Sequence, residues 1–97
     1  MATANGRQKI ESRVDEYIQY LKSNDASPLT IRNYSHYLKR LAAFMSDKED
    51  VVTPTHITLE LVEEFKTKLS SWGLSSKTQG YHLIALRSFF RWLAKKG

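Results

Sequence analysis

Cysteine is absent from this 97-residue chain, and proline and glycine are scarce, with two and four residues. The lack of cysteine excludes disulfides and thiolate metal ligands, and it is compatible with a reducing compartment. The apolar residues recur at helical rather than alternating spacing, which argues against a sandwich or barrel of many short strands. We therefore expect an all-α protein that folds through packing alone.

Long hydrophobic runs are also missing. No window approaches the roughly 18 apolar residues that a membrane-spanning helix needs, and the N-terminus has no apolar signal core. Apolar residues still make up 41% of the chain, which argues against general disorder. We expect a soluble protein with no membrane contact, in which residues 1–8 are a flexible leader and residues 9–97 form one domain.

Four segments carry apolar residues three, four and seven positions apart, as amphipathic helices do. The predicted helices cover residues 8–22, 28–46, 58–72 and about 76–97, with an irregular connection over 47–57. Ser27 followed by Pro28 is a start signal, because serine caps free amides and proline suits the first helical position. Ser75 or Ser76 caps the last helix, and Gly73 suits a left-handed helix end. The expected architecture is a small orthogonal bundle of four helices.

Acidic residues are missing from residues 26–46 and 65–97, although the chain contains ten. These stretches hold ten of the fifteen Lys and Arg residues, and the net charge is +5. If the second and fourth helices share one side of the bundle, that side would orient a polyanion. Their outward cationic, amide, imidazole and phenol groups could contact phosphates or base edges. The candidate nucleic-acid-binding residues are Thr30, Arg32, Asn33, His36, Arg40, Lys77, Tyr81, Arg87 and Arg91.

Residues that could carry catalysis or hold a metal do not form a recognisable pattern. His36, His56 and His82 are far apart in the sequence, and we expect His36 and His82 to be surface or half-buried residues. Paired carboxylates such as Glu63 and Glu64 fall on an exposed helical face. No Gly-rich phosphate loop or nucleophile elbow occurs. We expect a binding module with no catalytic residue, metal or cofactor.

Several short motifs occur in a characteristic order: Ser27-Pro28-Leu29-Thr30, then Ile57-Thr58, then Leu74-Ser75, then Leu86-Arg87-Ser88-Phe89-Phe90-Arg91-Trp92-Leu93. This series resembles the SAM-like core-binding domain of tyrosine recombinases and phage integrases, including the Xer group, over residues 8–97. The resemblance implies a four-helix domain that holds one face of duplex DNA while a C-terminal catalytic domain of the same chain grips the other. Other recombinase protomers on the DNA and a prokaryotic or mobile-element cytoplasm are implied as well.

In that family the second and fourth helices approach the major groove. Thr30 and Asn33 match DNA-facing positions at the start of the second helix, and Arg87 and Arg91 match basic positions on the last helix. The sequence departs from many relatives over residues 80–82, Gly-Tyr-His, where Asn or Arg is common. The family's catalytic residues belong to the C-terminal domain, so we expect no activity from this chain in isolation.

Three other interpretations stay open. The basic residues can be an ordinary solvated helix surface. The chain can be a helical protein–protein module whose charge only sets solubility. Binding of RNA or single strands would need exposed aromatic rings, whereas the spacing places most of Trp72, Phe89, Phe90 and Trp92 in or beside the core.

Overall fold

Four helices and the turns between them occupy residues 10–46 and 59–96, the parts of the chain that the computed structural model describes. α1 spans Ile10–Ser23, α2 Pro28–Ser46, α3 Leu59–Ser71 and α4 Ser76–Lys96. No strand occurs within these residues, which confirms the all-α prediction. The predicted leader, the connection over 47–57 and residue 58, where the third helix was predicted to begin, lie outside the described residues.

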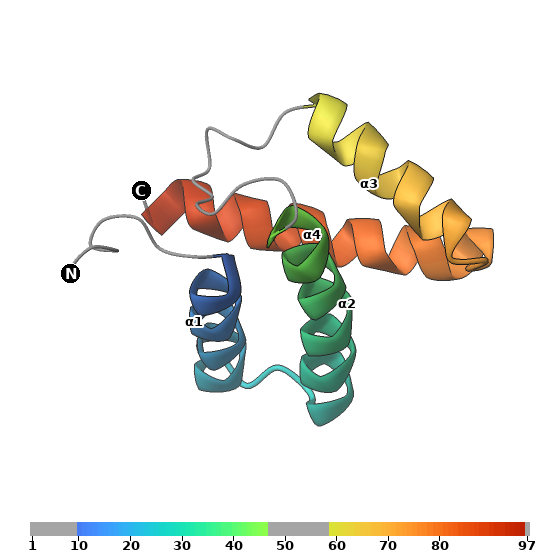
Figure 1. The fold of residues 1–97 in the computed structure, drawn as a ribbon. Helices are drawn as coiled ribbons and strands as arrows, with labels where there is room; N and C mark the ends of the chain where they lie inside the picture. The colour runs from blue at the N-terminus through green and yellow to red at the C-terminus, as the bar shows by residue number, and fades with distance from the viewer. Residues whose placement is uncertain (1–9, 47–58, 97) are drawn as a thin grey trace.

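The helices are arranged as a hairpin crossed by a long helix. α1 and α2 lie side by side and antiparallel, and α4 crosses both of them at a steep angle (Figure 1). α3 diverges from α4 at the short turn that joins them (Figure 1). This arrangement leaves one side of α4 next to α2 and another next to α3.

Left-handed residues end two of the helices. After α1, Asp25 has a φ of 61°, and the N–H of Ala26 reaches back to the Leu21 carbonyl at 3.1 Å. After α3, Gly73 has a φ of 76°, and its N–H donates to the Ser70 carbonyl at 3.0 Å. The left-handed end predicted at Gly73 is confirmed, and both turns satisfy carbonyls that a helix end would otherwise leave free.

The core lies where α4 crosses the hairpin. The ring centroid of Tyr17 on α1 is 5.5 Å from that of Phe89 and 5.4 Å from that of Trp92, both on α4. α3 joins through Phe65, whose ring centroid lies 5.2 Å from that of Phe44 on α2. The most deeply buried apolar side chains are Val14, Leu38, Leu41, Met45, Phe65, Leu69, Ala85, Phe89 and Leu93.

Two polar or aromatic side chains lie at burial levels that the helical pattern did not anticipate. His82 is 1% exposed, so the expectation of a surface or half-buried histidine is wrong. Its position four residues before Leu86 and seven before Phe89 puts it on the buried face of α4. Trp72 is 41% exposed, unlike Phe89 and Trp92, because it lies in the turn beyond the end of α3.

Candidate nucleic-acid interface

The same serine cap begins the two acid-free helices. The Ser27 hydroxyl accepts a hydrogen bond from the Thr30 N–H at 3.1 Å, and the Ser75 hydroxyl accepts one from the Thr78 N–H at 3.2 Å. In both caps the serine hydroxyl also bonds the threonine hydroxyl, at 2.9 and 3.0 Å. The start predicted at Ser27 is confirmed, and Ser75 rather than Ser76 caps α4. These bonds fix the first turns of α2 and α4.

An open groove of about 330 Å³ lies between α2 and α4. Its lining consists of Thr30, Asn33, Tyr34 and Tyr37 from α2 with Tyr81 and Ile84 from α4. The fold therefore brings together three of the predicted residues, Thr30, Asn33 and Tyr81, although the last is far from the other two in sequence. Asn33 is half-buried, and its side-chain amide has no hydrogen-bond partner among the described residues.

Arg40 and His82 connect the same two helices beside this groove. Arg40 Nη1 donates to His82 Nε2 at 3.1 Å, and His82 Nδ1 donates to the Thr78 carbonyl at 2.8 Å. The Arg40 guanidinium also lies over the Trp72 ring, with Cζ 5.8 Å from the ring centroid, while the Tyr37 and His82 ring centroids are 4.3 Å apart. Burial lowers the pKa of the His82 imidazole, and the charge of Arg40 lowers it further, although the bond to Thr78 acts in the opposite direction. Arg40 is thus held in one orientation by a neutral histidine and an aromatic face.

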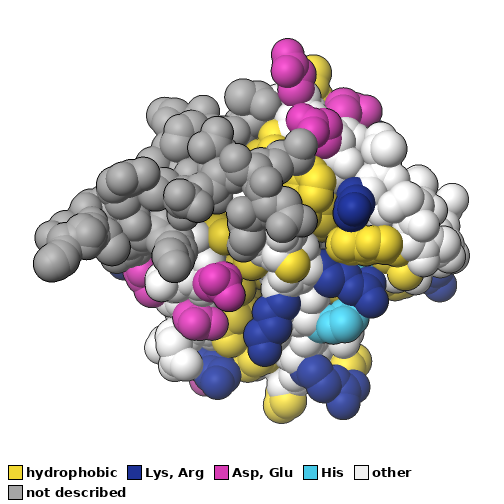
Figure 2. Space-filling view, in the orientation of Figure 1, with side chains coloured by type: hydrophobic (Ala, Val, Ile, Leu, Met, Phe, Trp, Pro, Cys, Tyr) yellow, Lys and Arg dark blue, Asp and Glu magenta, His cyan; other side chains and the backbone are white. Residues whose placement is uncertain are grey.

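Exposed cationic and imidazole groups lie on the two helices that form the groove. Arg32 and His36 are exposed on α2, and Lys77 is exposed in the first turn of α4. Figure 2 shows Lys, Arg and His side chains gathered over α2, with acidic side chains over α1 and the beginning of α3. The charge segregation seen along the sequence is therefore also a segregation in space on this face.

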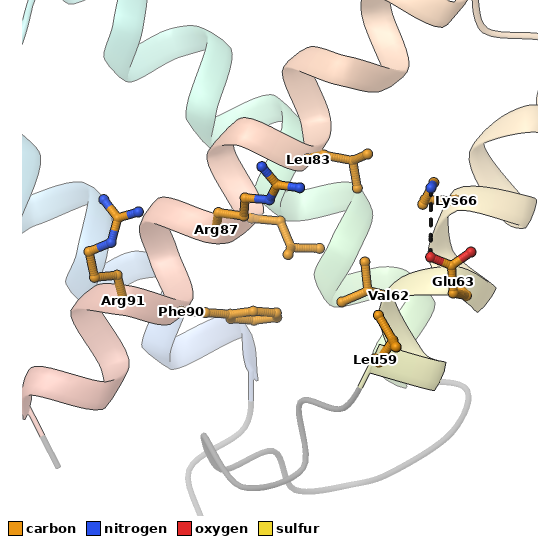
Figure 3. Close-up of a pocket in the computed structure, with 9 residues that line it drawn as sticks. Leu59, Val62, Glu63, Lys66, Leu83, Arg87, Phe90 and Arg91 are labelled. Atoms are coloured by element: carbon orange, nitrogen blue, oxygen red, sulfur yellow. Dashed lines mark ion pairs between the residues drawn. The ribbon is translucent and has the colours of Figure 1, made fainter.

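The remaining two predicted residues do not line the α2–α4 groove. Arg87 and Arg91 line a second groove, of about 390 Å³, between α3 and α4. Apolar side chains of both helices lie between them and α3 (Figure 3). An acidic residue enters this groove, because Glu63 of α3 pairs with Lys66 at 3.6 Å. The structure does not bring Arg87 and Arg91 into the α2–α4 groove.

Three lining residues of the α2–α4 groove, and the contact between His82 and Arg40, were not predicted from the sequence. Tyr34 and Tyr37 were not predicted because aromatic residues on a helix usually pack in the core, and both do pack against it. Ile84 could have been predicted from the sequence, because it lies seven residues from both Lys77 and Arg91 and outside the apolar stripe. In the structure its side chain is 52% exposed. No pattern in the sequence pairs His82 with Arg40, since the two are 42 residues apart.

No group of three or more His, Asp or Glu side chains within residues 10–46 and 59–96 could hold a metal ion. The same ranges contain no helix long and apolar enough to cross a membrane. The chemistry that the grooves offer is hydrogen bonding, positive charge and apolar contact.

A sequence profile for the family described as "Phage integrase, N-terminal SAM-like domain" matches residues 14–97. The chain belongs to this family. The resemblance identified from the motifs is therefore confirmed, and the four-helix architecture agrees with it. The matched range contains most of α1 and the whole of α2, α3 and α4, so both grooves belong to the SAM-like domain.

Curated relatives carry a recombinase name. The tyrosine recombinase XerC of Oceanobacillus iheyensis is 30% identical over 90 residues, which cover 92% of this chain and 29% of that protein. The tyrosine recombinase XerC of Escherichia coli (strain K12 / DH10B) is 28% identical over 88 residues, which cover 90% of this chain and 29% of that protein. The SAM-like domain thus spans about 29% of the length of these relatives. No solved structure matches the chain significantly.

Proposed function

We propose that this SAM-like domain binds duplex DNA through α2 and α4, as the core-binding part of a site-specific tyrosine recombinase. The observation that carries the proposal is that the two helices without any acidic residue share one groove, lined by polar, aromatic and aliphatic side chains, and also carry exposed cations. An α-helix fits the major groove of B-DNA, and cationic side chains beside it neutralise phosphates. Membership of the integrase family supports the same conclusion.

Two further parts of the proposal come from the family and the relatives. The match is to an N-terminal domain, so we assign the recombination chemistry to a C-terminal catalytic domain and no catalytic residue to this one. The relatives are named as recombinases, so the other protomers on the DNA are proposed partners. In this arrangement the domain supplies part of the grip on the duplex and does not react with it.

Binding by the domain alone should be weak and dominated by phosphates. Nonspecific duplex binding has a Kd of roughly 10⁻⁴ to 10⁻⁶ M at physiological salt. The affinity should fall steeply as salt rises, because each neutralised phosphate releases counterions.

NMR titration of labelled protein with a short duplex, at low and at moderate salt, tests the proposal. We expect amide shifts concentrated in residues 28–40 and 77–91, weakened by salt. Arg32→Gln with Lys77→Gln removes one exposed charge from each of the two helices that form the α2–α4 groove, and Arg87→Gln with Arg91→Gln removes the two arginines that line the α3–α4 groove. Each pair should weaken binding and reduce the slope of log Kd against log salt, by about one for each phosphate that the variant no longer neutralises. No shifts at low salt would contradict the proposal.

The α3–α4 groove supports a second candidate function, a protein-interaction module. Its lining includes Leu59, which is 77% exposed, together with Val62 and Phe90. Apolar surface of this kind is typical of a contact between protein chains. Concentration-dependent association in analytical ultracentrifugation without duplex binding would favour this candidate.

A further inference from the structure

The outward face of α4 combines positive charge with an exposed aliphatic side chain, Ile84. Lys77, Ile84 and Arg91 are spaced by seven residues and therefore lie in one row along the helix. Ile84 is 52% exposed, while Lys77 and Arg91 are also exposed. Ile84, in the middle of this row, has no polar group that could bind a phosphate, whereas the cations at both ends do.

The spacing of this row suits a major groove. Seven residues of helix rise about 10 Å, so Lys77 and Arg91 stand about 10 Å to either side of Ile84 and about 21 Å apart, a span that brings both near phosphates when the helix crosses the groove obliquely. The major groove of B-DNA is about 12 Å wide, with phosphates along both edges and base edges between them. A helix placed there with its two cations near phosphates presents Ile84 to the base edges.

Only one base pair offers an apolar group at that position. In the major groove, thymine carries a 5-methyl group, whereas the other base edges present hydrogen-bond donors and acceptors. The same A·T pair carries the N7 acceptor and N6 donor of adenine, which an asparagine or glutamine amide can bond with two hydrogen bonds. A protein site that recognises both features of an A·T pair therefore needs an apolar side chain next to an amide that is free to form hydrogen bonds.

The α2–α4 groove contains that pair of groups. Ile84 lines it from α4 and Asn33 lines it from α2. The Asn33 amide has both a donor and an acceptor, and neither is used by another described residue. By contrast, the Thr30 hydroxyl in the same groove already bonds the Ser27 hydroxyl at 2.9 Å.

We infer that Ile84 and Asn33 are specificity-determining residues that select an A·T base pair, with Ile84 contacting the thymine 5-methyl group and Asn33 bonding the adenine. This inference rests on the proposed binding of duplex DNA. It adds to that proposal a preferred base pair and two residues that recognise it.

Removing only the methyl group from the DNA tests the role of Ile84. Fluorescence anisotropy at low salt compares a short duplex of alternating adenine and thymine with the same duplex containing deoxyuridine in place of thymidine. A buried methyl-sized group contributes about 0.8 kcal/mol, so the thymine duplex should bind roughly fourfold more tightly for each methyl contacted. Ile84→Ala should abolish this preference, so that the thymine and deoxyuridine duplexes bind with equal affinity. Because Ile84 is half-exposed, this variant should fold.

Two further variants complete the design. Tyr20→Leu alters a comparably exposed residue on α1, 45% exposed, and should retain the thymine preference. Asn33→Ala should reduce the preference for A·T over G·C duplexes while keeping the difference between thymine and deoxyuridine. In the bound wild type, nuclear Overhauser contacts between the Ile84 methyls and the thymine methyl should be observed.

The outcomes separate the inference from the proposed function. Equal wild-type affinity for the thymine and deoxyuridine duplexes would overturn the inference and leave DNA binding intact. An unchanged preference in Ile84→Ala would also overturn it, because the preference would then come from the duplex itself. Failure of every duplex to bind at low salt would overturn the proposed function and this inference together.

Discussion

His82 on α4 accepts a hydrogen bond of 3.1 Å from Arg40 on α2, and the partners of its two ring nitrogens fix its protonation state. Arginine only donates, so Nε2 must be an acceptor. The Thr78 carbonyl only accepts, so Nδ1, 2.8 Å away, must carry the proton. The imidazole is therefore neutral in the folded protein, and a second proton would place an N–H against the guanidinium.

Acidification should destabilise the fold through this histidine. Burial lowers the pKa of His82 below the usual value near 6.5, so the unfolded chain takes up the proton more readily than the folded one. The stability that the neutral imidazole provides is complete above about pH 6.5 and is lost as the pH falls through the lowered pKa. Thermal unfolding followed by circular dichroism between about pH 5 and pH 8 should show this loss.

His82→Gln should flatten that pH dependence, whereas His36→Gln should retain it, because His36 is exposed. A profile that is the same in His82→Gln as in the wild type would show that His82 does not cause the acid sensitivity. The two variants thus separate the buried histidine from the exposed one on the neighbouring helix.

Removing Arg40 should destabilise the protein more than removing its exposed neighbour Lys39. Arg40→Leu leaves the buried Nε2 of His82 without a donor, which costs about 1–3 kcal/mol, and it also removes the contact with Trp72. Lys39→Leu should change the free energy of unfolding by less than about 0.5 kcal/mol. Urea denaturation measures the free energy of unfolding of both variants. Similar small decreases in the two variants would contradict a stabilising contact between Arg40 and His82.

The two glycines flanking the start of α4 should respond to alanine in opposite directions. A Cβ would meet nothing within 4 Å at either Gly73 or Gly80, so packing does not decide the outcome. Gly73 has a φ of 76°, which is strained for an alanine, so Gly73→Ala should lower the free energy of unfolding by about 1 kcal/mol. Gly80 lies inside α4, where alanine is the better helix former, so Gly80→Ala should raise the free energy of unfolding by about 1 kcal/mol. Equal effects in urea denaturation would contradict this explanation.

Helix boundaries were predictable because their signals are local. The range 28–46 predicted for the second helix coincides with α2, since Ser27 and Pro28 act within one turn. Gly73 was predictable for the same reason. Burial of the stripe around Phe89 followed from helical periodicity alone.

The arrangement around α4 was not predictable from the same signals. Which sector of a helix is covered depends on the neighbours that cross it, and periodicity does not identify these neighbours. The fold therefore places Arg87 and Arg91 beside α3 while Tyr81 and Ile84 lie beside α2. It also brings Glu63, from an acidic stretch of sequence, to the groove of those arginines.

Glu63 provides a test of whether the α3 side of α4 also faces DNA. Its carboxylate lies in the groove of Arg87 and Arg91, where it opposes a polyanion. A unit charge about 10 Å from a phosphate in water contributes about 0.4 kcal/mol, so Glu63→Gln should strengthen duplex binding about twofold at low salt. Glu11→Gln, which removes an exposed acid from α1, should have a smaller effect because α1 contributes no lining residue to either groove.

Arg87→Gln should move the affinity in the opposite direction from Glu63→Gln, and both effects should shrink as salt screens them. Fluorescence anisotropy over a salt series measures the affinity of all four variants: Glu63→Gln, Glu11→Gln, Arg87→Gln and Arg32→Gln. If Glu63→Gln and Arg87→Gln both leave the affinity unchanged while Arg32→Gln lowers it, contact is confined to the α2 side of α4. In that case the α3–α4 groove, with its apolar lining, is free for a protein partner while DNA is bound.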